Sequence, residues 1–309
     1  MRLSAIALPS LAAAALSTAA PAQIEVVTST PSLADIARNV GGERVDAASI
    51  MRGPENVHNV VPKPSHMMKV RGADLFVHGG LDGEPWVPLL LKGARNRALL
   101  PGGPGNVDAS RGIDLLEVPT PDQLTRAQGH IHVFGNTHYM LDPENGARVA
   151  ATIRDALARA DPAHAEEYRE RCARYQERLD AMTADLAKQL APWKGAAVVS
   201  YHRSFSYFLA RFGLRSIAEV EPKPGIAPGP QHLQAVVEAM KGENARLVLA
   251  EKYQPIENAE WVASRVGGKA VILAHEVGSL PGVTSYEAMF RENVGRLIAA
   301  FGGSPGKDR

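Results

Sequence analysis

The 309-residue sequence has one cysteine, few aromatic residues and almost no net charge. With Cys172 alone, neither an intrachain disulfide nor a cysteine-rich zinc cluster can form. The 34 Lys and Arg residues balance 33 Asp and Glu residues, which argues against a nucleic acid partner, because such proteins usually carry a strongly basic face. The hydrophobic fraction of 45% is typical of a folded globular protein.

Residues 1–22 have the layout of a secretory signal peptide. Arg2 precedes the apolar run Leu3–Leu16, and small residues end at Ala20–Ala22, an A-x-A cleavage pattern. A membrane anchor is the alternative, but the run is shorter than the roughly 20 residues that a span needs, and Pro9 interrupts it. We therefore expect a soluble exported protein.

After the signal peptide, short apolar runs alternate with helix-sized segments. This alternation predicts βαβ units and mostly parallel sheets, that is, an α/β fold. The length suggests roughly two domains. The expected strands are Ile24–Val27, Val45–Met51, Ala73–Val77, Ala196–Tyr201, Ser216–Val220, Leu247–Ala250 and Ala270–Leu273. The expected helices of the second half are Phe205–Phe212, His232–Met240, Ile256–Val266 and Tyr286–Phe301.

A long amphipathic helix is predicted between the two halves. Its apolar residues follow one another at intervals of three or four, with a start signal at Asp161-Pro162 and a stop at Pro192. The pattern lasts only about three heptads, which favours packing across the two lobes over a coiled-coil dimer. We therefore divide the chain into a signal peptide (1–22), an N-terminal α/β lobe (23–160), a linking helix (161–192) and a C-terminal α/β lobe (193–309). The apolar stripe is Tyr168, Cys172, Tyr175, Leu179, Met182, Leu186 and Leu190.

Three of the ten histidines lie on loops where ligands commonly bind. His58 is in a proline-rich loop after a predicted strand, and His138 precedes a helix. His202 directly follows an apolar strand. In open α/β sheets, ligands bind beyond the carboxyl ends of the strands, so several imidazoles could meet around one ion in a cleft between the lobes.

The segments around these histidines resemble the periplasmic metal-binding proteins that supply zinc or manganese to ABC importers. The segment 58–65 resembles the His-x-x-x-Pro-x-Pro-Ser motif of that family, and 138–143 resembles His-x-Trp-Leu-Asp-Pro with Met140 in place of tryptophan. The segment 202–208 resembles His-x-x-Phe-x-Tyr-Phe. The resemblance implies two lobes bridged by one long helix and metal ligation by His58, His138 and His202.

The fourth ligand departs from the family pattern. The family usually places an aspartate in a loop after a late strand, and here that loop contains His275 and Glu276 instead. By register, His275 takes the position of the aspartate. Glu276, Glu251 at the end of the preceding strand, or a water molecule are the alternatives.

The three imidazoles favour Zn(II) over Mn(II), because manganese sites prefer oxygen ligands. Imidazole must lose its proton to bind, so the affinity should fall below a pH of about 6.5. The resemblance implies a periplasmic binding protein that delivers zinc to an ABC permease in the inner membrane. A periplasmic metallochaperone is a further conceivable partner. We expect the protein to be a monomer. The alternative is an exported zinc-dependent hydrolase, which would use an open coordination position for water. His130 and His132 could collect metal or could be incidental residues of a solvated loop.

Overall fold

The computed structural model describes residues 23–120 and 134–302. The predicted signal peptide (1–22) and the pair His130 and His132 lie outside the described residues. Within them, no helix is both long enough and apolar enough to cross a membrane.

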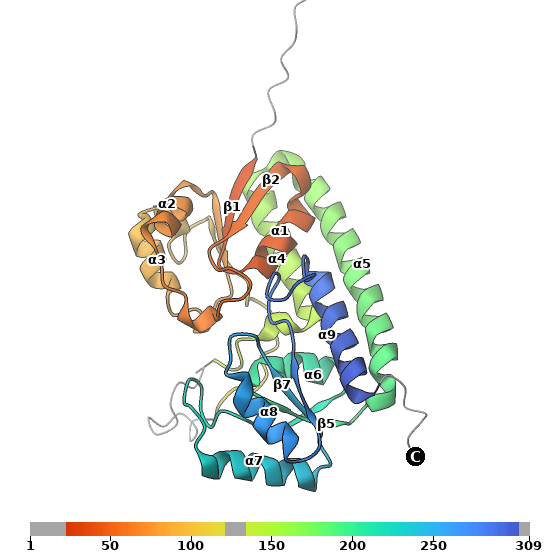
Figure 1. Ribbon diagram of the computed structural model, residues 1–309. Helices are drawn as coiled ribbons and strands as arrows, with labels where there is room; N and C mark the ends of the chain where they lie inside the picture. Colours follow the sequence, from red (N-terminus) through yellow and green to blue (C-terminus); the bar gives the residue numbers. More distant parts are fainter. Residues whose placement is uncertain (1–22, 121–133, 303–309) are drawn as a thin grey trace, which may run out of the picture.

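The first lobe is built on a parallel four-stranded sheet. Its strand order is β2-β1-β3-β4, and each neighbouring pair runs parallel (Figure 1). Apolar strand residues such as Val26 and Val77 are buried on this sheet, which explains why the run of β-branched residues forms strands here. The strands are β1 (Ile24–Thr28), β2 (Val45–Ser49), β3 (Leu75–His78) and β4 (Asn106–Asp108), and the helices between them are α1 (Pro31–Gly41), α2 (Pro64–Gly72) and α3 (Val87–Ala94).

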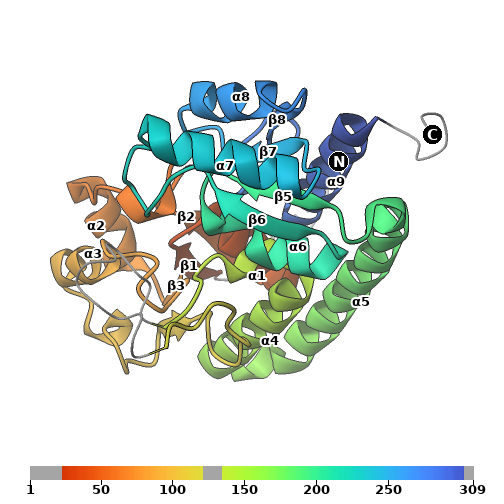
Figure 2. The same cartoon turned by 90° about the horizontal axis from the view of Figure 1, so that it is seen from below.

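The second lobe repeats this arrangement. Its sheet has the order β6-β5-β7-β8, again with every neighbouring pair parallel. Figure 2 shows α7 and α8 on one face of this sheet and α6 on the other. The strands are β5 (Ala197–Ser200), β6 (Arg215–Glu219), β7 (Leu247–Ala250) and β8 (Lys269–Ile272), and the helices are α6 (Ser206–Phe212), α7 (Pro230–Gly242) and α8 (Ile256–Ser264).

Two helices join the lobes. Helix α5 (Ala165–Leu190) runs along both of them, and α9 (Tyr286–Phe301) lies beside it (Figure 1). Helix α4 (Pro143–Ala160) packs against α5 and α1. All seven residues of the predicted apolar stripe on α5 are buried, because the helix covers both lobes with this one face. Cys172 is one of them, as expected for a core thiol.

Polar contacts at helix ends also hold the lobes together. An oxygen of Glu276 in the second lobe accepts a hydrogen bond from the backbone N–H of Ser32, in the first turn of α1, at 2.6 Å. Reciprocally, Asp35 of α1 accepts a bond from the backbone N–H of Tyr286 at the start of α9, at 2.9 Å. Both carboxylates satisfy N–H groups that a helix cannot pair internally, so each lobe caps a helix of the other.

The α/β prediction is confirmed, with two parallel-sheet lobes and one long helix. The seven expected strands are present, each within two residues of its predicted bounds. The sequence prediction missed β4, a three-residue strand with Val107 as its one buried residue. The domain boundaries at residues 160 and 192 remain a proposal, because α5 and α9 pack across the two lobes.

Candidate metal centre

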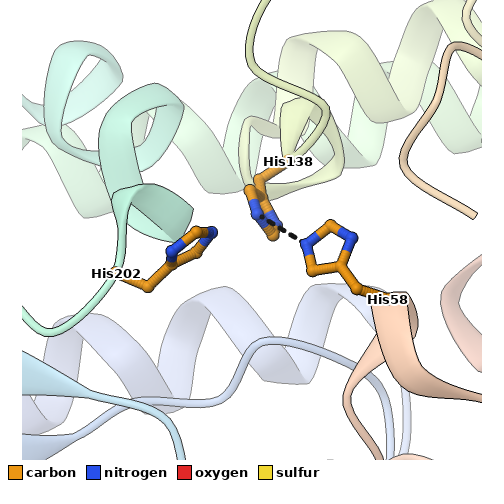
Figure 3. A group of neighbouring side chains, drawn as sticks. All are labelled: His58, His138 and His202. Carbon is orange, nitrogen blue, oxygen red and sulfur yellow. Dashed lines mark hydrogen bonds between the residues drawn. The ribbon is translucent and has the colours of Figure 1, made fainter. Parts of the chain in front are cut away.

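The side chains of His58, His138 and His202 meet between the two lobes (Figure 3). One potential ligand atom from each lies within 4.8 Å of the others. The ring centroids are 5.1 Å apart for His58 and His138, 5.2 Å for His138 and His202, and 6.0 Å for His58 and His202. Across residues 23–120 and 134–302, this is the one group of three or more His, Cys, Asp or Glu side chains placed to hold a metal ion.

His58 is held by the loop that follows β2. It lies in the 3-10 turn Val57–Asn59, where its backbone N–H donates to Oδ1 of Asn56 at 2.9 Å. The indole N–H of Trp86 donates to the carbonyl of Val57 at 2.7 Å and fixes the same turn. Nδ1 of His58 lies 2.7 Å from the carbonyl oxygen of Gly83. A carbonyl only accepts, so Nδ1 carries the proton and Nε2 keeps its lone pair for a metal.

His138 is positioned by a similar turn. Its backbone N–H donates to Oδ1 of Asn136 at 2.9 Å. The residues after it form the 3-10 turn Tyr139–Leu141 and then α4, whose N-cap is Asp142. Asp142 accepts a bond from the N–H of Glu144 and two from Arg211 of the second lobe. Asp142 therefore caps the helix and joins the lobes beside the site.

His202 comes from the second lobe, two residues after β5. It is 9% exposed, and its Nδ1 makes a hydrogen bond with Oε1 of Glu221, a residue that follows β6. Burial opposes protonation of His202, but the bond to Glu221 and the charge of Glu251 outweigh it, so the pKa of His202 is raised. With Nδ1 held by the carboxylate, Nε2 is the nitrogen left for the centre of the group.

The distance between two of these nitrogens matches a zinc site. Nε2 of His58 and Nε2 of His138 are 3.3 Å apart (dashed line in Figure 3). Two nitrogens that bind one tetrahedral zinc ion at 2.0–2.1 Å are separated by about 3.3 Å. The donor set consists of imidazole nitrogens, which suit zinc better than manganese. The geometry and the chemistry of the group thus both fit zinc.

The structure does not bring the three alternative protein ligands into this group. Nε2 of His275 lies 3.1 Å from the carbonyl oxygen of Glu55, and its ring packs edge-on against Tyr253. Glu276 caps α1, as described above. Glu251 is 1% exposed, its backbone N–H donates to Oε1 of Gln254 at 2.9 Å, and its Oε2 accepts a hydrogen bond from the side-chain amide of the same glutamine. His275 as a fourth ligand therefore stays a prediction. Its ring would have to leave the carbonyl of Glu55 and the ring of Tyr253 to reach the three imidazoles.

Two hollows adjoin the three imidazoles. A hollow of about 660 Å³ is lined by His58 and His202 together with residues 224–227 of the second lobe. A much smaller one, about 60 Å³, lies on the side of His138 and is lined also by Glu84, Glu251, His275 and Glu276. Burial raises the pKa of Glu84 to about 7. The larger hollow gives the imidazoles a route to solvent, and the smaller one places three carboxyl groups beside His138.

Sequence reasoning found the three histidines but missed the residues that orient them. Glu221 and the carbonyl of Gly83 were not singled out, because nothing along the chain indicates that they touch an imidazole. A usable signal did exist for the two turns. Asn56-Val57-His58 and Asn136-Thr137-His138 share the pattern Asn-x-His, in which the asparagine side chain accepts the N–H of the histidine two residues later.

Comparison with curated proteins gives full-length and partial relatives. A putative metal-binding protein of Treponema pallidum is 26% identical over 284 residues, which cover 90% of this chain and 87% of the relative. The high-affinity zinc uptake system protein ZnuA of Brucella abortus is 34% identical over 119 residues, or 38% of this chain and 36% of the relative. A zinc-binding protein AdcA of Streptococcus pyogenes is 25% identical, and the match covers 87% of this chain and about half (52%) of the relative.

Solved structures share the fold. A crystal structure of ZnuA superposes with a TM-score of 0.76 at 23% identity, covering 90% of this chain and 99% of the other. A periplasmic metal-binding protein of Candidatus Liberibacter asiaticus gives 0.74 at 18% identity, with coverage of 90% and 99%. The family described as the periplasmic component A of the zinc-uptake complex, ZnuA, matches residues 26–300. The chain therefore belongs to this ZnuA family.

Proposed function

We propose that His58, His138 and His202 hold a zinc ion that the protein carries as cargo. The function is that of a periplasmic substrate-binding protein of an ABC importer, as in the ZnuA family. The observation that supports this site is the convergence of three oriented imidazoles between the lobes, with a nitrogen separation of 3.3 Å that suits tetrahedral zinc. Zinc is the transported substrate here and takes part in no reaction.

The partner that follows is the membrane permease of an ABC importer, with its ATPase. We further infer that residues 1–22 direct export to the periplasm, that the protein acts as a monomer, and that a periplasmic metallochaperone is a conceivable donor of the metal. The comparisons give no support to the alternative of a zinc-dependent hydrolase. We infer that the chain is not an enzyme, since its relatives are named for zinc uptake and zinc binding.

Zinc titration of the chelator-stripped protein, in competition with a chromophoric chelator, tests this site. His58→Ala, His138→Ala and His202→Ala should each raise the Kd for zinc by more than the 10–100-fold that loss of an outer partner costs. His164→Ala is the matched control, because His164 bonds Asp161 at the start of the linking helix and is absent from the group. Wild-type affinity in any of the three variants would contradict the assignment of that histidine.

The same titration resolves the fourth ligand. His275→Ala, Glu251→Gln and Glu276→Gln each remove one protein candidate. A loss of affinity in one variant, with the other two unchanged, identifies the ligand. Unchanged affinity in all three indicates water. Turnover of ester or phosphate substrates by the zinc-loaded protein, lost in His202→Ala, would instead favour the hydrolase.

A further inference from the structure

Glu221 connects a proposed zinc ligand to a turn at the mouth of the cleft. One of its carboxylate oxygens, Oε1, bonds Nδ1 of His202. The other, Oε2, accepts a hydrogen bond from the backbone N–H of Gly225 at 3.3 Å. The Glu221 side chain is only 13% exposed, so its bond to His202 forms where water reaches poorly, whereas its bond to Gly225 lies at the exposed rim.

The turn that Glu221 holds has a defined conformation. The N–H of Ile226 donates to the carbonyl of Lys223 at 2.9 Å, which closes a four-residue β-turn. Pro224 and Gly225 occupy its two central positions, and Gly225 has a φ of +76°. Proline followed by a glycine with positive φ is the signature of a type II turn. Residues 223–226 are here named the Pro-Gly turn, and its last three residues, 224–226, line the larger hollow together with His58 and His202.

We propose that Glu221 is a positioning residue that makes the Pro-Gly turn respond to metal occupancy at His202. This rests on the proposed function, because it requires His202 to bind zinc. When Nε2 of His202 binds a cation, the ring is fixed and its Nδ1–H becomes a stronger donor. The Glu221 carboxylate is then fixed as well, and Oε2 stays in place for the N–H of Gly225.

Without the cation, no metal fixes Nε2 of His202, so the imidazole is less firmly fixed and the carboxylate shares its mobility. The Pro-Gly turn then loses a fixed acceptor. Ile226 is 54% exposed on this turn, so an apolar side chain at the cleft mouth becomes more ordered when zinc is bound. The rim of the second lobe therefore differs between the loaded and the empty protein, although no residue of the turn touches the metal.

Glu221→Gln tests the link between His202 and the Pro-Gly turn, because a side-chain amide can replace the carboxylate in only one of its two hydrogen bonds. If the amide oxygen faces His202, its NH₂ group meets the N–H of Gly225, donor against donor. If the oxygen faces Gly225, the NH₂ group donates to Nδ1, which places the imidazole proton on Nε2 and blocks the metal. We expect Glu221→Gln to raise the Kd for zinc by about 10–100-fold. Glu219→Gln is the matched control, since Glu219 ends β6, pairs with Arg203, and makes no hydrogen bond to His202 in the described residues.

Amide hydrogen exchange of Gly225, followed by NMR, supplies the readout that a merely structural role would not change. In the wild type and in Glu219→Gln, zinc should slow this exchange at least about tenfold. In Glu221→Gln saturated with zinc, the exchange should stay as fast as in the empty protein. The wild-type comparison needs no variant, so the proposal remains testable even if Glu221→Gln does not fold.

The outcomes separate the two proposals. If the wild type fails to bind zinc, or binds it equally well without His202, the proposed function and the coupling both fail. If the wild type binds zinc through His202 but Gly225 exchanges equally fast with and without metal, the coupling alone is wrong. Equal zinc affinity of Glu221→Gln and Glu219→Gln would likewise overturn only the role of Glu221.

Discussion

Gly53 is the position where the contact between the lobes most directly sets the spacing of the site. It precedes His58 by five residues, and a Cβ atom added to it would lie 2.3 Å from the carbonyl oxygen of Val277 and 2.3 Å from the carbonyl carbon of Gly278. Real Cβ atoms essentially never approach other atoms closer than 3.0 Å. Both obstacles are backbone atoms of the second lobe, so no flexible side chain can move aside.

Gly53→Ala must therefore separate the two backbones by at least about 0.7 Å, the difference between 3.0 and 2.3 Å. His58 is held by Gly83 of its own lobe and His202 by the other lobe, so this shift should lengthen the distance between them. Metal–ligand distances tolerate only about ±0.2 Å. We expect the Kd for zinc to rise at least about tenfold and the free energy of unfolding to fall by about 1–3 kcal/mol.

Chelator competition and urea unfolding measure the two effects. Gly295→Ala is the matched control: Gly295 is exposed within α9, and its added Cβ would meet nothing within 4 Å. That variant should bind zinc as the wild type does and gain about 0.4–1 kcal/mol of stability. A Gly53→Ala protein that folds and binds zinc with the wild-type Kd would refute the idea that this contact sets the spacing of the imidazoles.

Three further predictions concern stability. The hydroxyl of the buried Tyr286 shares its one proton between the carbonyls of Met140 at 2.6 Å and Asp142 at 3.1 Å, so Tyr286→Phe should lower the free energy of urea unfolding by about 1–3 kcal/mol; no change would show that this contact is not needed. Burial raises the pKa of Glu84 from 4.5 to about 7, so the folded protein retains a proton that the unfolded chain releases, and stability should fall as the pH rises from 4.5 to 7. Glu84→Gln should remove this pH dependence, which amounts to at most about 3 kcal/mol in the free energy of unfolding. Identical profiles of unfolding free energy against pH for the wild type and the variant would contradict the raised pKa. Leu179 is fully buried on α5, so Leu179→Ala should cost about 2–5 kcal/mol in the same urea assay, and a loss below that range would mean that the helix face is loosely packed.

The strands and helices could be predicted because their apolar residues repeat at the periods of buried elements. Leu247–Ala250 is a run of four apolar residues, and all four are buried in β7. The stripe on α5 was readable for the same reason. The strand β4 could not be predicted, because Val107 is its only apolar residue and its pairing with β3 depends on main-chain hydrogen bonds.

The candidate site was predictable only in part. Sequence motifs pointed to His58, His138 and His202, and the structure brings these three together. Register along the chain also pointed to His275, which the structure places against Tyr253 and the carbonyl of Glu55. Register gives the order of residues but not the direction of a side chain, which packing decides.

The sequence by itself determined the α/β architecture, the long helix and which imidazoles could act as ligands, because hydrophobic periodicity and local turns depend on neighbouring residues. Only the tertiary structure decided how those imidazoles are oriented. The acceptors that fix them, the carbonyl of Gly83 and the carboxylate of Glu221, come from segments 25 and 19 residues away in the chain. The spacing of the lobes likewise depends on contacts such as that of Gly53 with Gly278, which only close backbone packing creates.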